Sequence, residues 1–330
     1  MQLRQIGTSD LEATPIVFGA WAIGGWLWGG TDDEKAVEGI NAAIDAGINA
    51  IDTAPVYGFG HSERVVGEGI RGRRDEVLVF TKCGLRWNHD EGQHHFDSEK
   101  PDGEPVEIYR DLTRDSILWE CEQSLERLGV DHIDLYQCHW PDQTTPLEET
   151  MGALVELLDQ GMIRAIGVSN FTSEMIEECL AYGPVHSSQP KFSLLSRQSY
   201  DDVIAWCADH DIASVVYSPL EQGLLTGKVT PDREFREGDQ RRDKPWFTEE
   251  NITRVNAVID DVMRPIAERH EATVAQITLA WTIAAPGITC ALAGSRDATQ
   301  ATENAGAMSI DLSDHEYEQI RDAFWALEGP

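Results

Sequence analysis

Lysine is scarce in this sequence. Only six of its 26 basic residues are lysine, against 58 acidic residues, and the formal net charge is −32. This acidic excess argues against a nucleic-acid partner and against anionic membrane surfaces, because both are bound by clustered Lys and Arg. A lysine-poor acidic surface suits concentrated salt, where ions screen the repulsion between like charges. An ordinary acidic enzyme shares this signature, so both interpretations stay open.

Signals for secretion, membrane insertion and disulfide bonding are also missing. No run approaches the ~20 apolar residues that span a bilayer, and the N-terminal segment has no apolar core of signal-peptide length. No two of the six cysteines are closer than 17 residues. That spacing fits neither a zinc site nor a compact disulfide framework. We therefore expect a globular cytoplasmic protein.

Eight short apolar or β-branched runs alternate with amphipathic stretches along the 330 residues. Continuous apolar runs are typical of strands covered on both faces, and the alternation indicates parallel strands joined by helices. Eight such units most simply close into a single (β/α)8 TIM barrel of the α/β class, with residues 1–330 as one domain. A doubly wound open sheet is the alternative. The expected strands are 15–19, 48–52, 76–81, 132–137, 163–168, 185–189, 212–217 and 288–293.

Two connections are too long for ordinary turns. Residues 83–112 follow the third expected strand and residues 218–250 follow the seventh. Loops longer than ~12–15 residues are usually functional lids or disordered segments. In a barrel both would leave the C-terminal ends of strands, where barrel active sites lie.

The string from Gly67 to Gly72 matches the GxGxxG pattern of dinucleotide-binding loops. That pattern needs a strand before it and a helix after it. Here helical residues precede the string and an apolar strand follows, so we reject it as a nucleotide site.

A histidine- and acid-rich stretch could bind a metal ion. Exposed stretches of this kind bind metals adventitiously more often than functionally, so we predict no functional metal site. The residues concerned are His89, Asp90, Glu91, His94, His95 and Asp97.

Four polar residues stand where expected strands finish. Asp52 ends the second strand, and Tyr57 follows it by five residues; Lys82 closes the third strand, and His139 follows the fourth. In a barrel these side chains would meet at the C-terminal rim. Each also has a simpler interpretation: a turn-capping aspartate, a core tyrosine, a lysine that extends to the surface, or a core histidine.

Taken together, the four residues fit proton transfer to a carbonyl oxygen. Free tyrosine has a pKa of ~10 and is a poor acid at neutral pH. The ammonium of Lys82 would lower the pKa of Tyr57, and Asp52 would keep that ammonium charged. His139 could hold the carbonyl oxygen by a hydrogen bond. A rival hypothesis makes Lys82 the Schiff-base lysine of a barrel aldolase.

The segment DTAPVYG (52–58), with a downstream lysine and histidine, resembles the signature of the aldo-keto reductase superfamily. SNF (169–171), YSPLEQGLLTGK (217–228) and AGSRDATQATEN (293–304) match further family blocks in order. The resemblance implies a barrel that binds NADP(H) across its C-terminal face. Tyr57 would be the general acid, tuned by Lys82 and Asp52, and His139 would orient the carbonyl. The sequence resembles the bacterial long-loop branch, related to potassium-channel β subunits, so a cofactor-binding sensor with little turnover is the alternative.

The matching blocks also imply cofactor residues. One group would hold the nicotinamide end, a second would cover the pyrophosphate, and a third would hold the adenosine phosphate. A guanidinium suits a 2′-phosphate, which favours NADP(H), but Gly294 and Gln300 stand where many family members have Lys and Arg, so NAD(H) stays open. The three groups are Trp21, Ser169, Asn170, Gln189 and Tyr217; Ser218, Pro219, Leu220, Gln222 and Lys228; and Gly294, Ser295, Arg296, Gln300, Glu303 and Asn304.

Tryptophan is concentrated in segments that follow expected strands. We predict that these side chains form the wall of a pocket for a small carbonyl substrate. An aromatic wall accepts aldehydes of many shapes and also sugar rings. The residues expected to contact substrate are Trp26, Trp28, Trp87, Trp140 and Trp246.

Overall fold

The chain folds around a closed barrel of eight parallel strands. A computed structural model describes residues 3–330, and the strands follow one another around the barrel in chain order. This confirms the predicted (β/α)8 barrel, and the open-sheet alternative is wrong. The strands are β3 (Ile16–Gly19), β4 (Ala50–Asp52), β5 (Leu78–Cys83), β9 (Ile133–Cys138), β10 (Ile163–Ser169), β11 (Ser187–Gln189), β12 (Ala213–Val216) and β13 (Ile288–Gly294).

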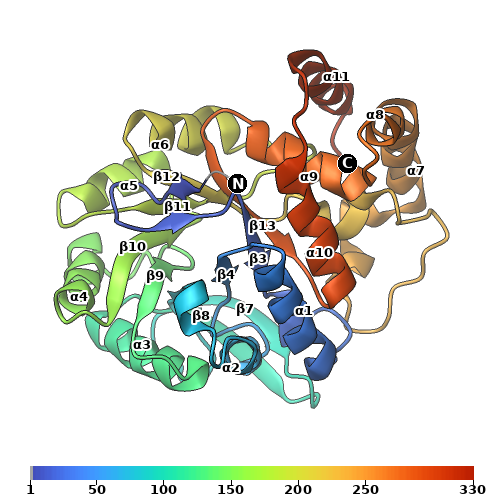
Figure 1. The fold of residues 1–330 in the computed structure, drawn as a ribbon. Helices are drawn as coiled ribbons and strands as arrows, with labels where there is room; N and C mark the ends of the chain where they lie inside the picture. The colour runs from blue at the N-terminus through green and yellow to red at the C-terminus, as the bar shows by residue number, and fades with distance from the viewer. Residues whose placement is uncertain (1–2) are drawn as a thin grey trace.

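Helices surround the barrel and cover the outer faces of its strands (Figure 1). No helix in the described range 3–330 combines the length and apolarity needed to cross a bilayer. The helices are α1 (Asp33–Asp45), α2 (His61–Gly69), α3 (Arg114–Leu128), α4 (Leu147–Asp159), α5 (Ser173–Leu180), α6 (Ala205–Asp209), α7 (Glu249–Val258), α8 (Arg264–Arg269), α9 (Val274–Ala284), α10 (Ala298–Gly306) and α11 (Asp314–Trp325).

A short hairpin that the sequence analysis missed closes the N-terminal end of the barrel. Its strands β1 (Arg4–Gln5) and β2 (Glu12–Ala13) pair antiparallel. Ile6 and Leu11 are fully buried against the side chains that fill the barrel interior, such as Phe80. The hairpin therefore leaves only the C-terminal end of the barrel open to ligands.

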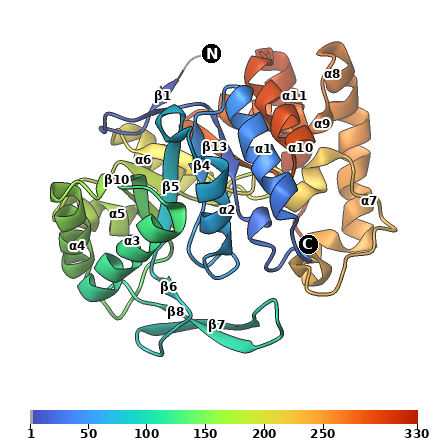
Figure 2. The same cartoon turned by 60° about the horizontal axis from the view of Figure 1, so that its bottom comes forward.

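Both long connections leave C-terminal strand ends as expected, but neither is a structureless loop. Residues 83–112 form a three-stranded antiparallel sheet of β6 (Leu85–Arg86), β8 (Pro105–Arg110) and β7 (Gln93–Glu99), which projects from the barrel (Figure 2). The segment after β12 contains three short 3₁₀ helices, η4 (Glu221–Thr226), η5 (Gln240–Asp243) and η6 (Pro245–Phe247).

The first two glycines of the rejected GxGxxG string serve helix packing. Gly67 and Gly69 lie on α2, with β5 following in the chain. A Cβ on Gly67 would stand 2.4 Å from the carbonyl oxygen of Leu128 at the end of α3, and one on Gly69 would collide with Ile40 of α1. These residues are glycine because three helices approach closely here.

We expect Gly67→Ala to destabilise the fold by about 1–3 kcal/mol, because the added methyl group meets backbone that cannot move aside cheaply. Gly152→Ala is the matched control: Gly152 is an exposed residue of α4 with open space around its Cβ position. There alanine should stabilise the helix by about 1 kcal/mol. Urea unfolding of both variants measures the difference, and the same sign for both would contradict the packing argument.

Candidate active site

A groove of about 820 Å³ crosses the C-terminal end of the barrel. Three of the four predicted catalytic residues line it directly, namely Asp52, Tyr57 and His139. The fourth, Lys82, is fully buried beneath the groove floor and reaches the others from below. The structure therefore brings these four side chains together.

The carboxylate of Asp52 is the centre of a buried polar network. Its Oδ1 accepts from Lys82 Nζ over 2.6 Å, and its Oδ2 accepts from Gln189 Nε2 over 2.9 Å and from Gln137 Nε2 over 3.2 Å. Lys82 Nζ also donates to the carbonyl oxygen of Thr53. Four strands thus contribute one side chain each to the buried network around the Lys82–Asp52 ion pair.

Gln137 is a member of this network that the sequence analysis missed. It is fully buried on β9, and its Oε1 accepts from Gln189 Nε2 over 3.1 Å. Because Gln189 Nε2 donates to Asp52 and to Gln137, Gln189 Oε1 is the amide atom left to accept from a ligand. A glutamine near the C-terminal end of a buried strand was the signal available in the sequence.

Tyr57 is held in place by a close approach of two loops. The backbone of η1 (Ala22–Gly24) touches the backbone at Tyr57 so closely that a Cβ on Gly24 would stand 2.7 Å from the carbonyl carbon of Tyr57. Lys82 Nζ lies 5.2 Å from the centroid of the Tyr57 ring, and the His139 ring meets it edge-on at 5.7 Å. The phenol is thereby fixed between a cation and an imidazole.

The pKa of Tyr57 differs from the expectation drawn from the sequence. Burial, with a contribution from the charge of Asp52, raises the pKa of Tyr57 well above 10 instead of lowering it. Burial, with the positive charge of Lys82, lowers the pKa of His139 well below 6.5. Burial also lowers the pKa of Lys82, although the Asp52 carboxylate opposes this change. At neutral pH the groove therefore holds a protonated phenol and a neutral imidazole.

The Schiff-base hypothesis for Lys82 does not fit the structure. Its ammonium is fully buried, donates to Asp52 and Thr53, and lies under the Tyr57 ring. A substrate carbonyl in the groove would have to displace Tyr57 before it reached Nζ.

The residues expected at the nicotinamide end form a connected set. Tyr217 donates its hydroxyl to Asn170 Oδ1 over 2.9 Å, and Asn170 Nδ2 donates to Ser169 Oγ and to the carbonyl oxygen of His139. All three line the groove together with Gln189. Asn170 takes a positive φ of 62°, a backbone conformation that costs energy in non-glycine residues and is concentrated at functional sites.

Nearly all other residues of the three expected cofactor groups also line the groove. The exception is Ser295, which is buried and accepts a hydrogen bond from Asn304 Nδ2 over 2.9 Å. It therefore supports Asn304 and does not face the groove. The lining members are Trp21, Ser218, Pro219, Leu220, Gln222, Lys228, Gly294, Arg296, Gln300, Glu303 and Asn304.

Positive charge is concentrated in this groove, although the chain as a whole is strongly acidic. Four of the six lysines lie in or beneath it: Lys82, Lys191, Lys228 and Lys244. Lysine and arginine contribute six lining side chains, against three acidic ones. Two of the arginines and two of these lysines were not predicted, because their positions in connections between strands and helices carry no pattern. They are Arg233, Arg241, Lys191 and Lys244, whereas the third arginine, Arg296, was expected at the adenosine end.

The segments that follow β3 and β12 meet at the groove. Trp28, in the segment after β3, forms an antiparallel bridge with Asp239, and the Gln240 amide donates to the carbonyl oxygen of Leu27. Arg241 forms an ion pair with Asp239, and its guanidinium lies over the Trp28 ring at 5.2 Å. These contacts partly cover the groove.

Aromatic side chains form one wall of the groove, as expected, with one exception. Trp26, Trp28, Trp140 and Trp246 line it. Trp87 does not, because it packs edge-on against Phe59 at 5.6 Å, and Phe59 in turn packs on Trp26. Trp87 is thus one layer behind the wall. Two further lining residues from β7, His95 and Phe96, were not predicted as substrate contacts.

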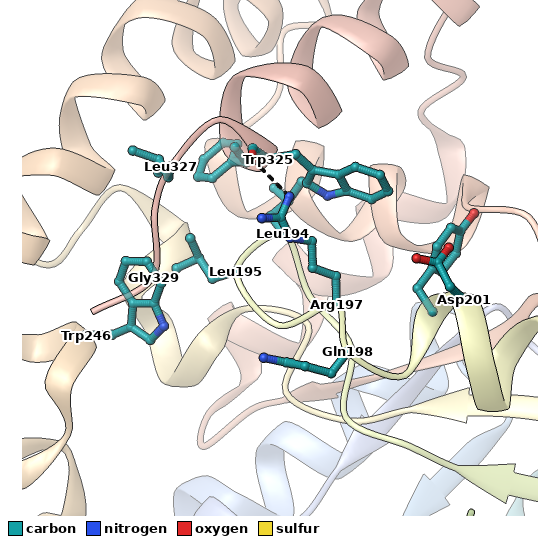
Figure 3. A pocket seen from close by; sticks show the side chains of 11 residues that line it. Leu194, Leu195, Arg197, Gln198, Asp201, Trp246, Trp325, Leu327 and Gly329 are labelled. Atoms are coloured by element: carbon teal, nitrogen blue, oxygen red, sulfur yellow. Dashed lines mark hydrogen bonds between the residues drawn. The ribbon is translucent and has the colours of Figure 1, made fainter. Parts of the chain in front are cut away.

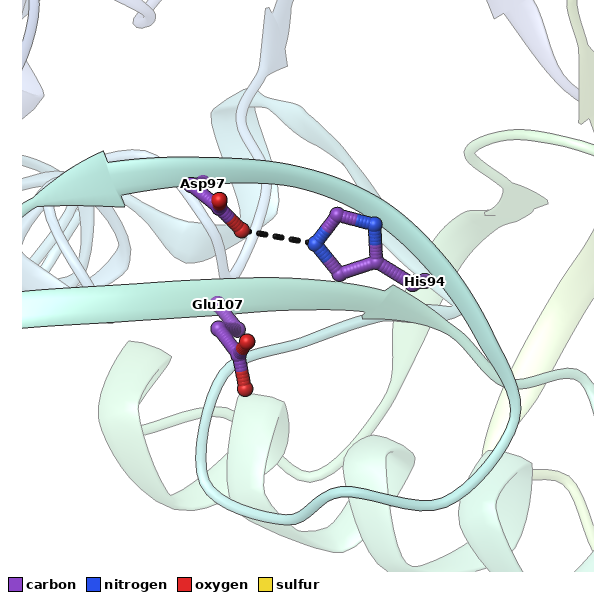
Figure 4. A group of neighbouring side chains, drawn as sticks. All are labelled: His94, Asp97 and Glu107. Atoms are coloured by element: carbon purple, nitrogen blue, oxygen red, sulfur yellow. Dashed lines mark hydrogen bonds and ion pairs between the residues drawn. The ribbon is translucent and has the colours of Figure 1, made fainter.

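Part of the histidine-rich stretch gathers on the exposed side of the projecting sheet. His94 and Asp97 on β7 and Glu107 on β8 place one ligand atom each within 4.8 Å of one another (Figure 4). His94 Nε2 lies 2.7 Å from Asp97 Oδ1. All three side chains are exposed, and none of them lines the groove.

A second cavity of about 450 Å³ lies between the segment after β11 and the C-terminal tail (Figure 3). In it Arg197 Nη1 donates to the carbonyl oxygen of Trp325 over 3.0 Å. Trp246 lines both cavities, so its indole belongs to the wall of each.

Comparison with known proteins identifies the family. The model of the aldo/keto reductase family matches residues 15–324. Aldo-keto reductase YhdN of Bacillus subtilis (strain 168) is 39% identical over 298 residues, which are 90% of this chain and 85% of the relative. NADH-specific methylglyoxal reductase of Escherichia coli (strain K12) is 37% identical over 99% of this chain and 100% of the relative.

Solved structures of related proteins have the same fold. The glycerol dehydrogenase AKR11B4 of Gluconobacter oxydans superposes with a TM-score of 0.86 at 36% identity, covering 97% of this chain and 94% of that one. A probable voltage-gated potassium channel β subunit of Arabidopsis thaliana is also a relative, 29% identical over 94% of this chain and 92% of its own. The chain belongs to the aldo/keto reductase family, and reductases of this family use NAD(P)H.

The groove fits such a cofactor by the chemistry of its side chains. The amide groups of Asn170 and Gln189 lie at one end, next to Tyr57, and Asn304 and Arg296 lie at the other. Cationic side chains suited to phosphates line the same groove in a chain of net charge −32.

We expect NADPH affinity to fall on the order of fivefold between pH 7 and pH 9. Burial and the charge of Lys191 lower the pKa of Lys244 to about 8, so this ammonium is charged at pH 7 and largely neutral at pH 9. The attraction for phosphate is lost as the pH rises. Calorimetric titration of the protein with NADPH measures the change.

Two variants identify the responsible group. Lys244→Arg stays charged and should bind NADPH tightly at both pH values, whereas Lys244→Gln should bind weakly at both. A Lys244→Gln variant that keeps the wild-type pH dependence would show that another group titrates.

Proposed function

We propose that this protein is an NADP(H)-dependent reductase that converts aldehyde and ketone carbonyls, either simple aldehydes or sugar carbonyls, to alcohols, with Tyr57 as the general acid. The observation that carries this proposal is the meeting of Tyr57, His139 and the buried Lys82–Asp52 pair at the floor of a cation-lined groove. A carbonyl oxygen between Tyr57 and His139 would meet two neutral hydrogen-bond donors.

When bound, the reduced nicotinamide supplies a hydride to the carbonyl carbon. Residues of the protein protonate the carbonyl oxygen and hold it in position. Tyr57, kept protonated by its raised pKa, donates its proton to that oxygen, which completes the alcohol. The positive charge of Lys82 below the ring then stabilises the phenolate that remains. His139, neutral because of its lowered pKa, donates one hydrogen bond to the oxygen and orients the carbonyl.

Tyr57→Phe should lower turnover by a factor on the order of 10² or more, because the general acid is lost, while NADPH affinity changes little. Loss of reduced-nicotinamide absorbance with an aromatic aldehyde measures turnover, and calorimetry measures binding. Tyr182→Phe is the control, since Tyr182 is 41% exposed and lies outside the groove.

The outcomes separate the competing functions. Near-normal turnover in the Tyr57→Phe variant would remove Tyr57 from its role. A wild-type protein that binds NADPH but consumes none with any carbonyl would be a sensor, and one that binds no nicotinamide cofactor would overturn the proposal.

The preference for NADP(H) over NAD(H) rests on Arg296, the exposed guanidinium that lines the adenosine end of the groove just before α10. Lys228 contributes less net charge there, because Glu303 pairs with it at 2.9 Å. One relative is NADH-specific and another, from Schizosaccharomyces pombe, is named for NADP(+), so the preference depends on individual residues of this groove.

Arg296→Ala should raise the KM for NADPH about tenfold and the KM for NADH far less, because only NADPH carries the 2′-phosphate that a guanidinium binds. Steady-state kinetics with both cofactors measure the ratio. Arg321→Ala is the charge-matched control, since Arg321 is a partly exposed residue of α11 that pairs with Asp322 and lies outside the groove. Equal losses with both cofactors would contradict a role in discrimination.

A further inference from the structure

His95 brings a second imidazole into the groove, from an element outside the barrel. It lies on β7 of the projecting sheet, is half-buried, and lines the groove together with Phe96, Trp140 and His139. Its ring packs on Phe96 at 4.9 Å and on Trp140 at 5.3 Å. Its ring is also near enough to His139 to affect the titration of that residue. The groove wall around His95 is otherwise aromatic.

Arg110 determines the tautomer of this histidine. Arg110 Nη2 lies 2.9 Å from His95 Nδ1, and a guanidinium can only donate, so Nδ1 is the unprotonated nitrogen. In the neutral ring the proton is then on Nε2. Burial and the charge of Arg110 lower the pKa of His95 to about 4, so the ring stays neutral at working pH.

Arg110 is itself held in place. Its guanidinium lies over the Trp140 ring at 5.2 Å, and Nη1 donates to the carbonyl oxygen of Pro141. Trp140 directly follows His139 in the chain. The orientation of His95 is therefore fixed by the same segment that presents the catalytic imidazole.

Within residues 3–330, His95 Nε2 has no hydrogen-bond partner. Nε2 is not a buried atom and is accessible to a ligand in the groove that His95 lines. A donor held in place in this way favours ligands that supply an acceptor for it. A substrate carbonyl lying between Tyr57 and His139 would place its neighbouring carbon atoms toward this wall.

We propose that His95 is a specificity-determining residue, and that its Nε2–H donates to an oxygen on the carbon next to the reacting carbonyl. The favoured substrates are then α-hydroxy aldehydes and ketones, or α-dicarbonyls, over plain aldehydes of the same size. This inference rests on the proposed reductase function and adds to it the class of substrate.

The test compares three substrates of three carbons: glyceraldehyde, methylglyoxal and propionaldehyde. The holoenzyme is assayed with NADPH, and the quantity measured is kcat/KM for each oxygenated substrate divided by that for propionaldehyde. His95→Phe keeps a ring but loses the donor, and should lower both ratios about tenfold. His95→Gln restores an N–H at a similar distance from the backbone and should recover most of each ratio.

His94→Phe is the matched control. It changes the adjacent histidine, which is exposed on the other side of β7 and pairs with Asp97, and should leave both ratios at the wild-type value. Unchanged ratios in His95→Phe, or ratios in His95→Gln no higher than in His95→Phe, would overturn the role of His95 while leaving the reductase function intact. Absence of NADPH consumption by the wild type with all three substrates would overturn the reductase function and this inference together.

Discussion

The buried ion pair between Lys82 and Asp52 is the interaction on which the site depends. Removing two charges from water costs several kcal/mol per ion, and the pair persists only where further hydrogen bonds satisfy its remaining atoms. Gln137, Gln189 and the carbonyl oxygen of Thr53 supply those bonds. The two glutamines come from β9 and β11, and the ion pair joins β4 to β5, so the complete network forms only when the barrel has closed. Its position beneath the groove then determines where Tyr57 and a carbonyl can meet.

Charge is divided between the groove and the rest of the molecule. Lysine is nearly absent elsewhere, and the two lysines outside the groove, Lys35 and Lys100, are each paired with an acidic neighbour. The groove keeps its cations against an acidic background, which favours anionic cofactors there and disfavours them elsewhere. The suggestion that the acidic surface is suited to concentrated salt remains a prediction.

Much of this molecule follows from local pattern, and the exceptions have identifiable causes. Apolar runs predicted the eight strands, and polar residues at strand ends predicted which side chains meet in the groove, because parallel strands bring their C-terminal ends to one rim. The projecting sheet was missed because Gln93–Glu99 is polar on both faces and lacks a buried-strand pattern. Trp87 was misplaced because a tryptophan in a connection can pack one layer behind a pocket as readily as in it.

The sequence by itself determined the barrel, the position of each strand and the identity of the residues that meet at its rim, since all of these depend on periodicity and chain order. Only the tertiary structure decided the protonation of Tyr57 and His139, the partners of Gln137 and the tautomer of His95. Those properties depend on burial and on hydrogen bonds between segments far apart in the chain, such as Arg110 with His95 and Gln189 with Asp52. Local sequence carries no record of such contacts, because they exist only after the barrel has closed.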